Sequence, residues 1–103
     1  MRRLAEGSAA MSARDWREFW RLRGMRELRL VLWASWDPVR GAPPHAYDRH
    51  AFRIASLLGS RAPRAALAEE LGRVRREFEL PGSADEDERS AGAITSWFVS
   101  AAA

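Results

Sequence analysis

The residues best suited to chemistry lie close together between positions 37 and 50. Two histidines, His45 and His50, flank Asp48, and Asp37 precedes all three. Zinc ligands on one helix usually stand at i and i+4, with further ligands elsewhere in the chain. The histidines are five residues apart and no second ligand cluster follows, so the sequence predicts no metal. Acid–base chemistry by Asp37 and Asp48 is conceivable, but no neighbouring pattern supports it.

Other routes to catalysis lack a sequence signature as well. None of Ser56, Ser60 and Ser96 stands in a G-x-S-x-G setting. The glycines match neither a phosphate-binding loop nor a dinucleotide fingerprint. The absence of cysteine excludes disulfides and thiolate metal sites and permits a reducing compartment. We therefore expect a non-enzymatic, cytoplasmic protein with no catalytic residues and no cofactor.

The segment Trp36-Asp37-Pro38 has two interpretations. An aspartate before proline readily forms an Asx-turn or caps a following helical turn, which would make the segment a structural corner. Alternatively, the Asp37 carboxylate contacts a partner. The sequence favours the structural corner, with Trp33 and Trp36 in the core because large aromatic side chains dominate cores.

Candidate partner-binding residues follow from the side chains that supply most interface hot spots, namely Trp, Tyr and Arg. Trp16 and Trp20 lie one helical turn apart among arginines. They either dock an amphipathic helix on the rest of the protein or face a partner. The connection after Trp36 and the start of the next helix supply further candidates, which are Arg40, His45, Tyr47 and Asp48.

The charge is unevenly distributed along the chain. All seventeen basic residues are arginine and the formal net charge is +3. Residues 1–40 hold nine arginines and five acids, giving +4, whereas residues 41–103 hold eight arginines and nine acids, giving −1. The basic first helix makes nucleic acid an alternative partner, with phosphate contacts from Arg14, Arg17, Arg21 and Arg26. The longest strongly apolar run, residues 30–34, is too short to span a bilayer, so no membrane partner is expected.

Hydrophobic spacing of about 3.6 residues predicts helices throughout, and no segment alternates with a period of two. We expect a flexible arm over residues 1–12 and one helical domain over residues 13–103. In that domain, helix 13–35 is either kinked or broken at Gly24. A Pro/Gly-rich connection over residues 37–46 leads to a helix that begins near Tyr47 and is ended by Gly59-Ser60.

Two further helices complete the predicted bundle. Pro63 is placed as the first residue of a helix whose apolar stripe is Leu67, Leu71, Val74 and Phe78. Glu69 and Arg73 have the i, i+4 spacing of an ion pair. Ser83 and Glu86 form a capping box for the last helix. The fold class is therefore all-α, a compact bundle of four to five helices.

The succession of these motifs resembles a family of small uncharacterised bacterial proteins. Its hallmark is a leucine-rich helix followed by Trp-Asp-Pro-Ile-Gly and, about ten residues on, Tyr-Asp. Here the corresponding residues are Leu28 to Leu32, Trp36-Asp37-Pro38-Val39 and Tyr47-Asp48. The chain departs from the pattern at Val39-Arg40. The resemblance implies a helical bundle with no established enzymatic activity, and some similar proteins lie in toxin–immunity loci.

These observations favour a non-enzymatic protein-interaction module, to which the resemblance adds an immunity-like or antitoxin-like role. The identity of the protein partner is not encoded in any motif. A nucleic-acid-associated regulator that uses the Arg-rich first helix is the alternative.

Overall fold

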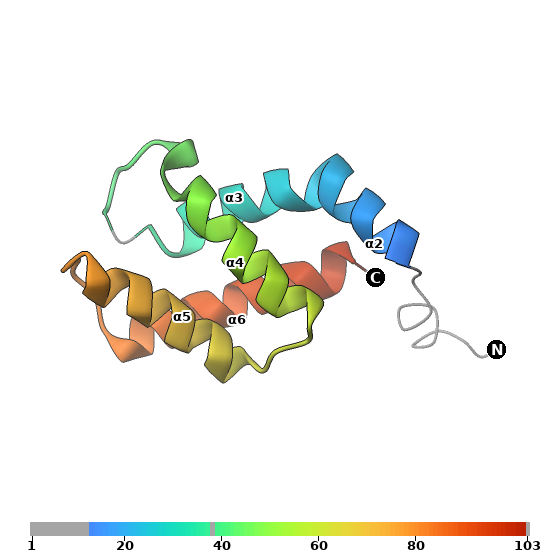
Figure 1. Cartoon of the computed structure of the whole chain (residues 1–103). Coiled ribbons are helices and arrows are strands. Elements are labelled where there is room, and N and C mark those ends of the chain that lie inside the picture. The colour runs from blue at the N-terminus through green and yellow to red at the C-terminus, as the bar shows by residue number, and fades with distance from the viewer. Residues whose placement is uncertain (1–12, 38, 103) are drawn as a thin grey trace.

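Every regular element in residues 13–37 and 39–102, the part of the chain described by this computed structural model, is helical. The structure thus confirms the all-α prediction. The α-helices are α2 (Ala13–Phe19), α3 (Met25–Ser35), α4 (Asp48–Gly59), α5 (Arg64–Glu77) and α6 (Ala84–Ala101). A π-helical turn, Trp20–Gly24, joins α2 to α3, and a 3-10 turn, Pro44–Tyr47, precedes α4 (Figure 1). The arm expected over residues 1–12 and Pro38 of the segment Trp36-Asp37-Pro38 lie outside the described residues.

The first two α-helices form one continuous helix through the π turn. Phe19 and Gly24, at the two junctions, both keep right-handed helical backbone angles. A Cβ on Gly24 would stand 2.6 Å from Cε3 of Trp20 and 2.8 Å from Cε2 of Phe19. Gly24 therefore leaves room for the aromatic side chains of the preceding turn. A π turn inserted in an α-helix changes the direction of its faces, and the glycine marks no break in the helix.

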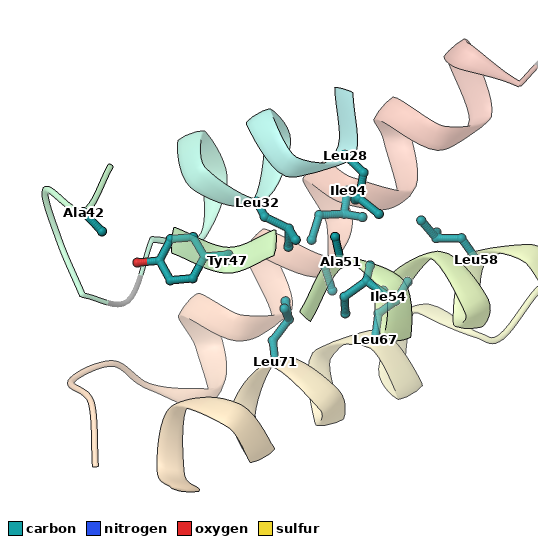
Figure 2. Packing of buried hydrophobic residues seen from close by; sticks show 11 residues of the cluster. Leu28, Leu32, Ala42, Tyr47, Ala51, Ile54, Leu58, Leu67, Leu71 and Ile94 are labelled. Carbon is teal, nitrogen blue, oxygen red and sulfur yellow. The ribbon is translucent and has the colours of Figure 1, made fainter. Parts of the chain in front are cut away.

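The core lies where α3, α4, α5 and α6 meet (Figure 2). Leucine and isoleucine side chains from all four helices are almost completely buried there, and they are Leu28, Leu32, Ile54, Leu67, Leu71 and Ile94. Because each helix contributes residues at i, i+3 or i+4 spacing, its apolar stripe faces the same centre. The helical hydrophobic pattern in the sequence is thus the pattern that builds this core.

A buried ion pair joins α5 to α6. The guanidinium of Arg75 donates from Nη2 to Oδ2 of Asp87 at 2.7 Å, and its Nε lies 3.2 Å from both carboxylate oxygens. The two side chains are only 10% and 4% exposed. Gly82, with φ +140°, lies against Arg75, since a Cβ on it would come within 2.5 Å of the arginine Cδ. The connection Leu80-Pro81-Gly82 therefore covers the ion pair.

The predicted helix ends agree with the structure for α6 and only partly for α5 and α4. Ser83 accepts the backbone N–H of Glu86 through Oγ at 3.2 Å, which confirms the cap expected for α6. Pro63 is the N-cap of α5 and not its first helical residue, which is Arg64. The helix α4 ends at Gly59-Ser60 as predicted, but the residue that closes it is not the glycine. Gly59 stays within the helix, and Arg61, with φ +60°, takes the left-handed position that usually holds glycine.

Three side-chain predictions were wrong. Arg73 binds Glu70 and Glu77, whereas Glu69 lies 3.7 Å from Arg76. The stripe of α5 ends at Val74, because the helix stops at Glu77 and Phe78 is 52% exposed. Trp33, predicted to lie in the core, is exposed at 36%, and its Nε1 donates to the carbonyl of Ala42 at 2.6 Å.

The Arg75–Asp87 pair gives a test of the α5–α6 contact. Asp87→Asn preserves the shape of the side chain but leaves a buried guanidinium without its anion. We expect the free energy of unfolding, measured by urea denaturation, to fall by about 3–5 kcal/mol. Glu69→Gln, at the exposed pair with Arg76, is the matched control and should cost less than about 1 kcal/mol. Equal small losses from both variants would contradict a structural role for the buried pair.

Candidate functional site

The connection between α3 and α4 is organised around the carboxylate of Asp37. The hydroxyl of Tyr47 donates to Oδ1 of Asp37 at 2.5 Å, and the backbone N–H of Gly41 donates to Oδ2 at 2.9 Å. The Tyr47 hydroxyl oxygen also accepts the backbone N–H of Val39 at 3.1 Å. Tyr47 is 4% exposed and Asp37 is half-buried. Asp37 therefore has the structural role predicted for it. Its carboxylate holds the connection through the Gly41 backbone and the Tyr47 hydroxyl, and it does not cap a helix.

These contacts shift the ionisation of both side chains. Burial raises the pKa of Asp37, but the hydrogen bonds from Tyr47 and from the backbone of Gly41, Ala42 and Arg40 outweigh it, so the pKa lies below its usual value. The pKa of Tyr47 is raised to about 12, mainly by burial and secondly by the hydrogen bond to Asp37. At neutral pH the pair is therefore an ionised carboxylate bound to a neutral phenol.

An open groove of about 520 Å³ lies beside this corner. We call it the Phe78 groove. It is lined by the connection, the start of α4 and the end of α5, through Trp36, Val39, Ala46, Tyr47, Arg49, His50, Val74, Phe78 and Leu80. Val39 is 51% exposed and Phe78 is 52% exposed, so both offer apolar surface to a molecule that would occupy the groove.

Aromatic rings line much of the Phe78 groove. The Trp36 ring lies 5.3 Å from the ring of Tyr47 and meets the ring of His50 edge-to-face at 6.4 Å. His50 lies 6.3 Å from the ring of Phe78. Burial lowers the pKa of His50, and the charges of Arg49 and Arg73 lower it further. The imidazole is therefore neutral at pH 7 and behaves as part of an aromatic surface.

Trp36 also borders a second, polar cleft of about 520 Å³ on the side of α6. Its charged side chains balance, since Arg40, Arg75 and Arg89 face Asp37, Glu86 and Asp87. Arg75 is already paired with Asp87, and Arg40 lies 4.0 Å from Glu86. The cleft therefore presents mixed charge and no excess of either sign. His45 and Asp48 do not line it.

The helix α2 and the π turn, which carry Trp16 and Trp20, lie at the other end of the molecule from the connection (Figure 1). Trp16 stacks on Phe98 of α6 with ring centroids 5.5 Å apart, and Trp20 stacks on the same ring at 5.8 Å. Trp97 joins this cluster and donates from Nε1 to Glu27 at 3.0 Å. Both candidate tryptophans are half-buried, and their stacking fixes the first helix against α6.

The remaining candidates lie around the connection in different environments. Arg40 is exposed and has φ +63°, and His45 is exposed on the 3-10 turn. Asp48 is half-buried and lies 3.5 Å from Arg29 of α3. The structure thus brings Tyr47 together with Trp36 and Asp37, and it places Trp16 and Trp20 elsewhere. In residues 13–37 and 39–102, no three His, Cys, Asp or Glu side chains come together as a set of metal ligands.

Val39, His50 and Phe78 were missing from the predicted site. Phe78 continued the apolar stripe of α5, so the sequence assigned it to the core. Only the end of the helix at Glu77 moves its side chain onto the surface. Val39 is an isolated apolar residue in a loop, which carries no signal of its own.

Comparison with family models, curated proteins and solved structures finds no match for the chain. None of the described helices combines the length and the apolar character that crossing a membrane requires.

The Tyr47–Asp37 contact gives a direct spectroscopic test. Tyr47 is the only tyrosine, so the near-ultraviolet absorbance of tyrosinate reports its ionisation alone. We expect a midpoint near pH 12 in the folded protein, compared with about 10 in the urea-unfolded chain. Because the folded pKa is raised, the stability from this group is complete below about pH 10 and is lost as the pH rises through the folded value.

Asp37→Asn is the control for that titration. This variant removes the carboxylate that binds the Tyr47 hydroxyl, so the Tyr47 titration midpoint should fall. It should stay above the midpoint of the unfolded chain, because the burial of Tyr47 remains. The lowered pKa of Asp37 predicts a loss of stability on the acid side as well. The free energy of unfolding should fall as the pH drops through the pKa of Asp37 in the folded protein. A folded-state tyrosine midpoint equal to that of the unfolded chain would contradict the buried hydrogen bond.

Proposed function

We propose that the protein is a non-enzymatic protein-interaction module that binds its partner through the Phe78 groove. The observation that carries this proposal is an apolar groove with two half-exposed side chains, Val39 and Phe78, on a surface held by internal hydrogen bonds. A preorganised aromatic surface loses little conformational freedom on binding. Apolar and aromatic anchors in such pockets supply most of the affinity of protein interfaces.

The groove indicates what part of a partner it would accept. Its apolar walls suit a large apolar side chain, and the exposed Arg49 at its edge has no ion pair with a described residue. The segment bound would therefore present an apolar anchor beside a carboxylate. Arg40 and His45, exposed on the same connection, would contact the partner around the groove, whereas Tyr47 and Asp37 would hold its shape.

The absence of an enzymatic role is part of the proposal. Catalysis by Asp37, His45 and Asp48 would need these groups to share one polar site. Asp37 is committed to Tyr47 and Gly41, His45 is exposed, and Asp48 faces Arg29. An immunity-like or antitoxin-like role in a bacterial cytoplasm rests on the resemblance at Trp36-Asp37-Pro38 and on the absence of cysteine.

A nucleic-acid partner is the second candidate, supported by exposed arginines along α2 and α3. Arg14, Arg17 and Arg26 are exposed and form no ion pair with a described residue, while Arg21 lies 3.4 Å from Glu18. Such side chains are available to phosphates. The acids interspersed among them weaken the positive field, which makes this the less favoured function.

Site-specific photocrosslinking tests the interaction proposal. A photoreactive phenylalanine analogue at position 39 or 78 should crosslink one and the same protein in the native cell. Positions 52 and 99, where Phe52 is 69% exposed and Val99 is 65% exposed, are matched controls outside the groove. Phe78→Ser should abolish recovery of that protein without loss of helicity, whereas Phe52→Ser should not. Equal crosslinking at all four positions would refute a specific groove.

Nucleic-acid binding has a separate test. If Arg14, Arg17 and Arg26 contact phosphates, a gel shift with duplex DNA should weaken steeply with salt, with a log–log slope of about −0.9 per contact. The triple substitution of these arginines by glutamine should abolish the shift. A shift that is absent in low salt, or that persists unchanged in high salt, would remove this alternative.

A further inference from the structure

A third cavity, of about 290 Å³, lies at the end of the bundle that is remote from the Phe78 groove. We call it the Arg61 pocket. It is formed by α2, the end of α4, the connection to α5 and the last turns of α6, which Figure 1 shows near one another. Its lining residues are Trp16, Leu58, Arg61, Ala62, Thr95, Phe98, Val99 and Ala102. Small-molecule sites share this composition, with mostly apolar walls and a few polar groups.

The apolar walls of the Arg61 pocket include two aromatic residues, Trp16 and Phe98. Trp16 and Phe98 stack with an interplanar angle of 17° and present adjacent rings. Leu58, which is 4% exposed, belongs to the core and gives the pocket a rigid wall. An apolar molecule in this space would extend the packing of the core without requiring a movement of the helices.

Two polar side chains in the pocket have no partner among the described residues. The hydroxyl oxygen of Thr95 is buried and makes no hydrogen bond. The Arg61 side chain is exposed and forms no ion pair with a described carboxylate. Rotation of about 120° about the Cα–Cβ bond moves the Thr95 hydroxyl to another staggered position, so the direction in which it points can change without backbone movement. Both groups can donate a hydrogen bond, and both therefore suit an acceptor that carries negative charge.

The backbone of Arg61 has a conformation that is unusual for a residue with a side chain, and Asp37, Arg40 and Glu79 also have positive φ. Arg61 has φ +60°, and two hydrogen bonds, from its N–H to Leu58 O and from the N–H of Ala62 to Leu57 O, close the end of α4. Glycine is the favoured residue at such a helix end because a side chain there strains the backbone. The chain places glycine two residues earlier and accepts an arginine in the strained position. Strain of this kind is concentrated at functional sites.

We propose that the Arg61 pocket binds a small organic carboxylate. The apolar body packs against Trp16, Phe98 and Leu58, and the carboxylate pairs with Arg61 and accepts the hydrogen bond of Thr95. An exposed arginine among mostly apolar lining residues gives the site both charged and apolar character, which is the complement of such an anion. This inference does not depend on the function proposed for the Phe78 groove.

Binding can be measured with simple probes on the full chain. Octanoate represents a linear carboxylate, 2-naphthoate a flat aromatic one, and 1-octanol the apolar body without charge. In ¹⁵N-resolved NMR, at least one carboxylate should shift the Trp16 indole, Thr95 and Val99 signals saturably and leave Phe78 unchanged. That carboxylate should bind about tenfold or more tightly than 1-octanol, because a charge-assisted hydrogen bond is lost in the alcohol.

Arg61→Gly separates ligand recognition from folding. It relieves the strained backbone, so the Tm should rise while the carboxylate affinity falls about tenfold and the alcohol affinity is unchanged. Arg40→Gly is the matched control, since Arg40 has the same left-handed backbone but lies outside the pocket. It should raise the Tm and leave carboxylate binding intact.

Three results would overturn the proposal. One is the absence of saturable carboxylate binding up to millimolar concentrations. Another is equal affinity for the carboxylate and the alcohol, or for wild type and Arg61→Gly. The third is a set of shifts centred on Trp36, Val39 and Phe78, which would place the anion in the Phe78 groove.

Discussion

The hydrogen bonds of one carboxylate, that of Asp37, hold the connection on which the main candidate surface depends. Asp37 and Arg40 both have positive φ, at +32° and +63°, so the backbone is strained at both residues. Tyr47 compensates this strain because its hydroxyl donates to Asp37 and accepts from Val39. The buried hydroxyl thus uses both its hydrogen-bond donor and its acceptor within the loop. A carboxylate engaged in this way is unavailable to a partner unless the loop opens.

The other wall of the Phe78 groove depends on the end of α5. The N–H of Leu80 donates to Arg75 O at 2.8 Å, and Glu79 takes the left-handed conformation with φ +53°. This arrangement stops the helix and leaves Phe78 on the surface. Arg75 supplies the carbonyl for that turn and its guanidinium for the ion pair with Asp87. The same residue therefore fixes the end of α5 and the contact with α6.

The fold was predictable from the sequence to the extent that it follows from local pattern. The end of α3 at Ser35 and the cap at Ser83 agree with prediction because helix period and capping are properties of neighbouring residues. The site was less predictable. The left-handed conformation at Arg61 has no signature in residue type, and the choice of Glu70 and Glu77 over Glu69 as partners of Arg73 depends on rotamers. Tyr47 was predicted to contact a partner. It is buried instead, because its hydroxyl binds Asp37, and no local sequence pattern predicts that contact.

The two apolar sites are separated by the core, and this separation has a thermodynamic consequence. Leu28, Leu32 and Ile94, all almost fully buried, belong to the cluster at the centre of the four packed helices (Figure 2). Close-packed side chains of this kind do not deform continuously, so occupancy of one site changes the other only if a discrete second packing exists. Residues 13–37 and 39–102 show one packing, with each helix stripe engaged. Ligands at the Arg61 pocket and at the Phe78 groove should therefore bind with independent free energies. Any measured coupling between them would be evidence for a second arrangement of α3 against α6.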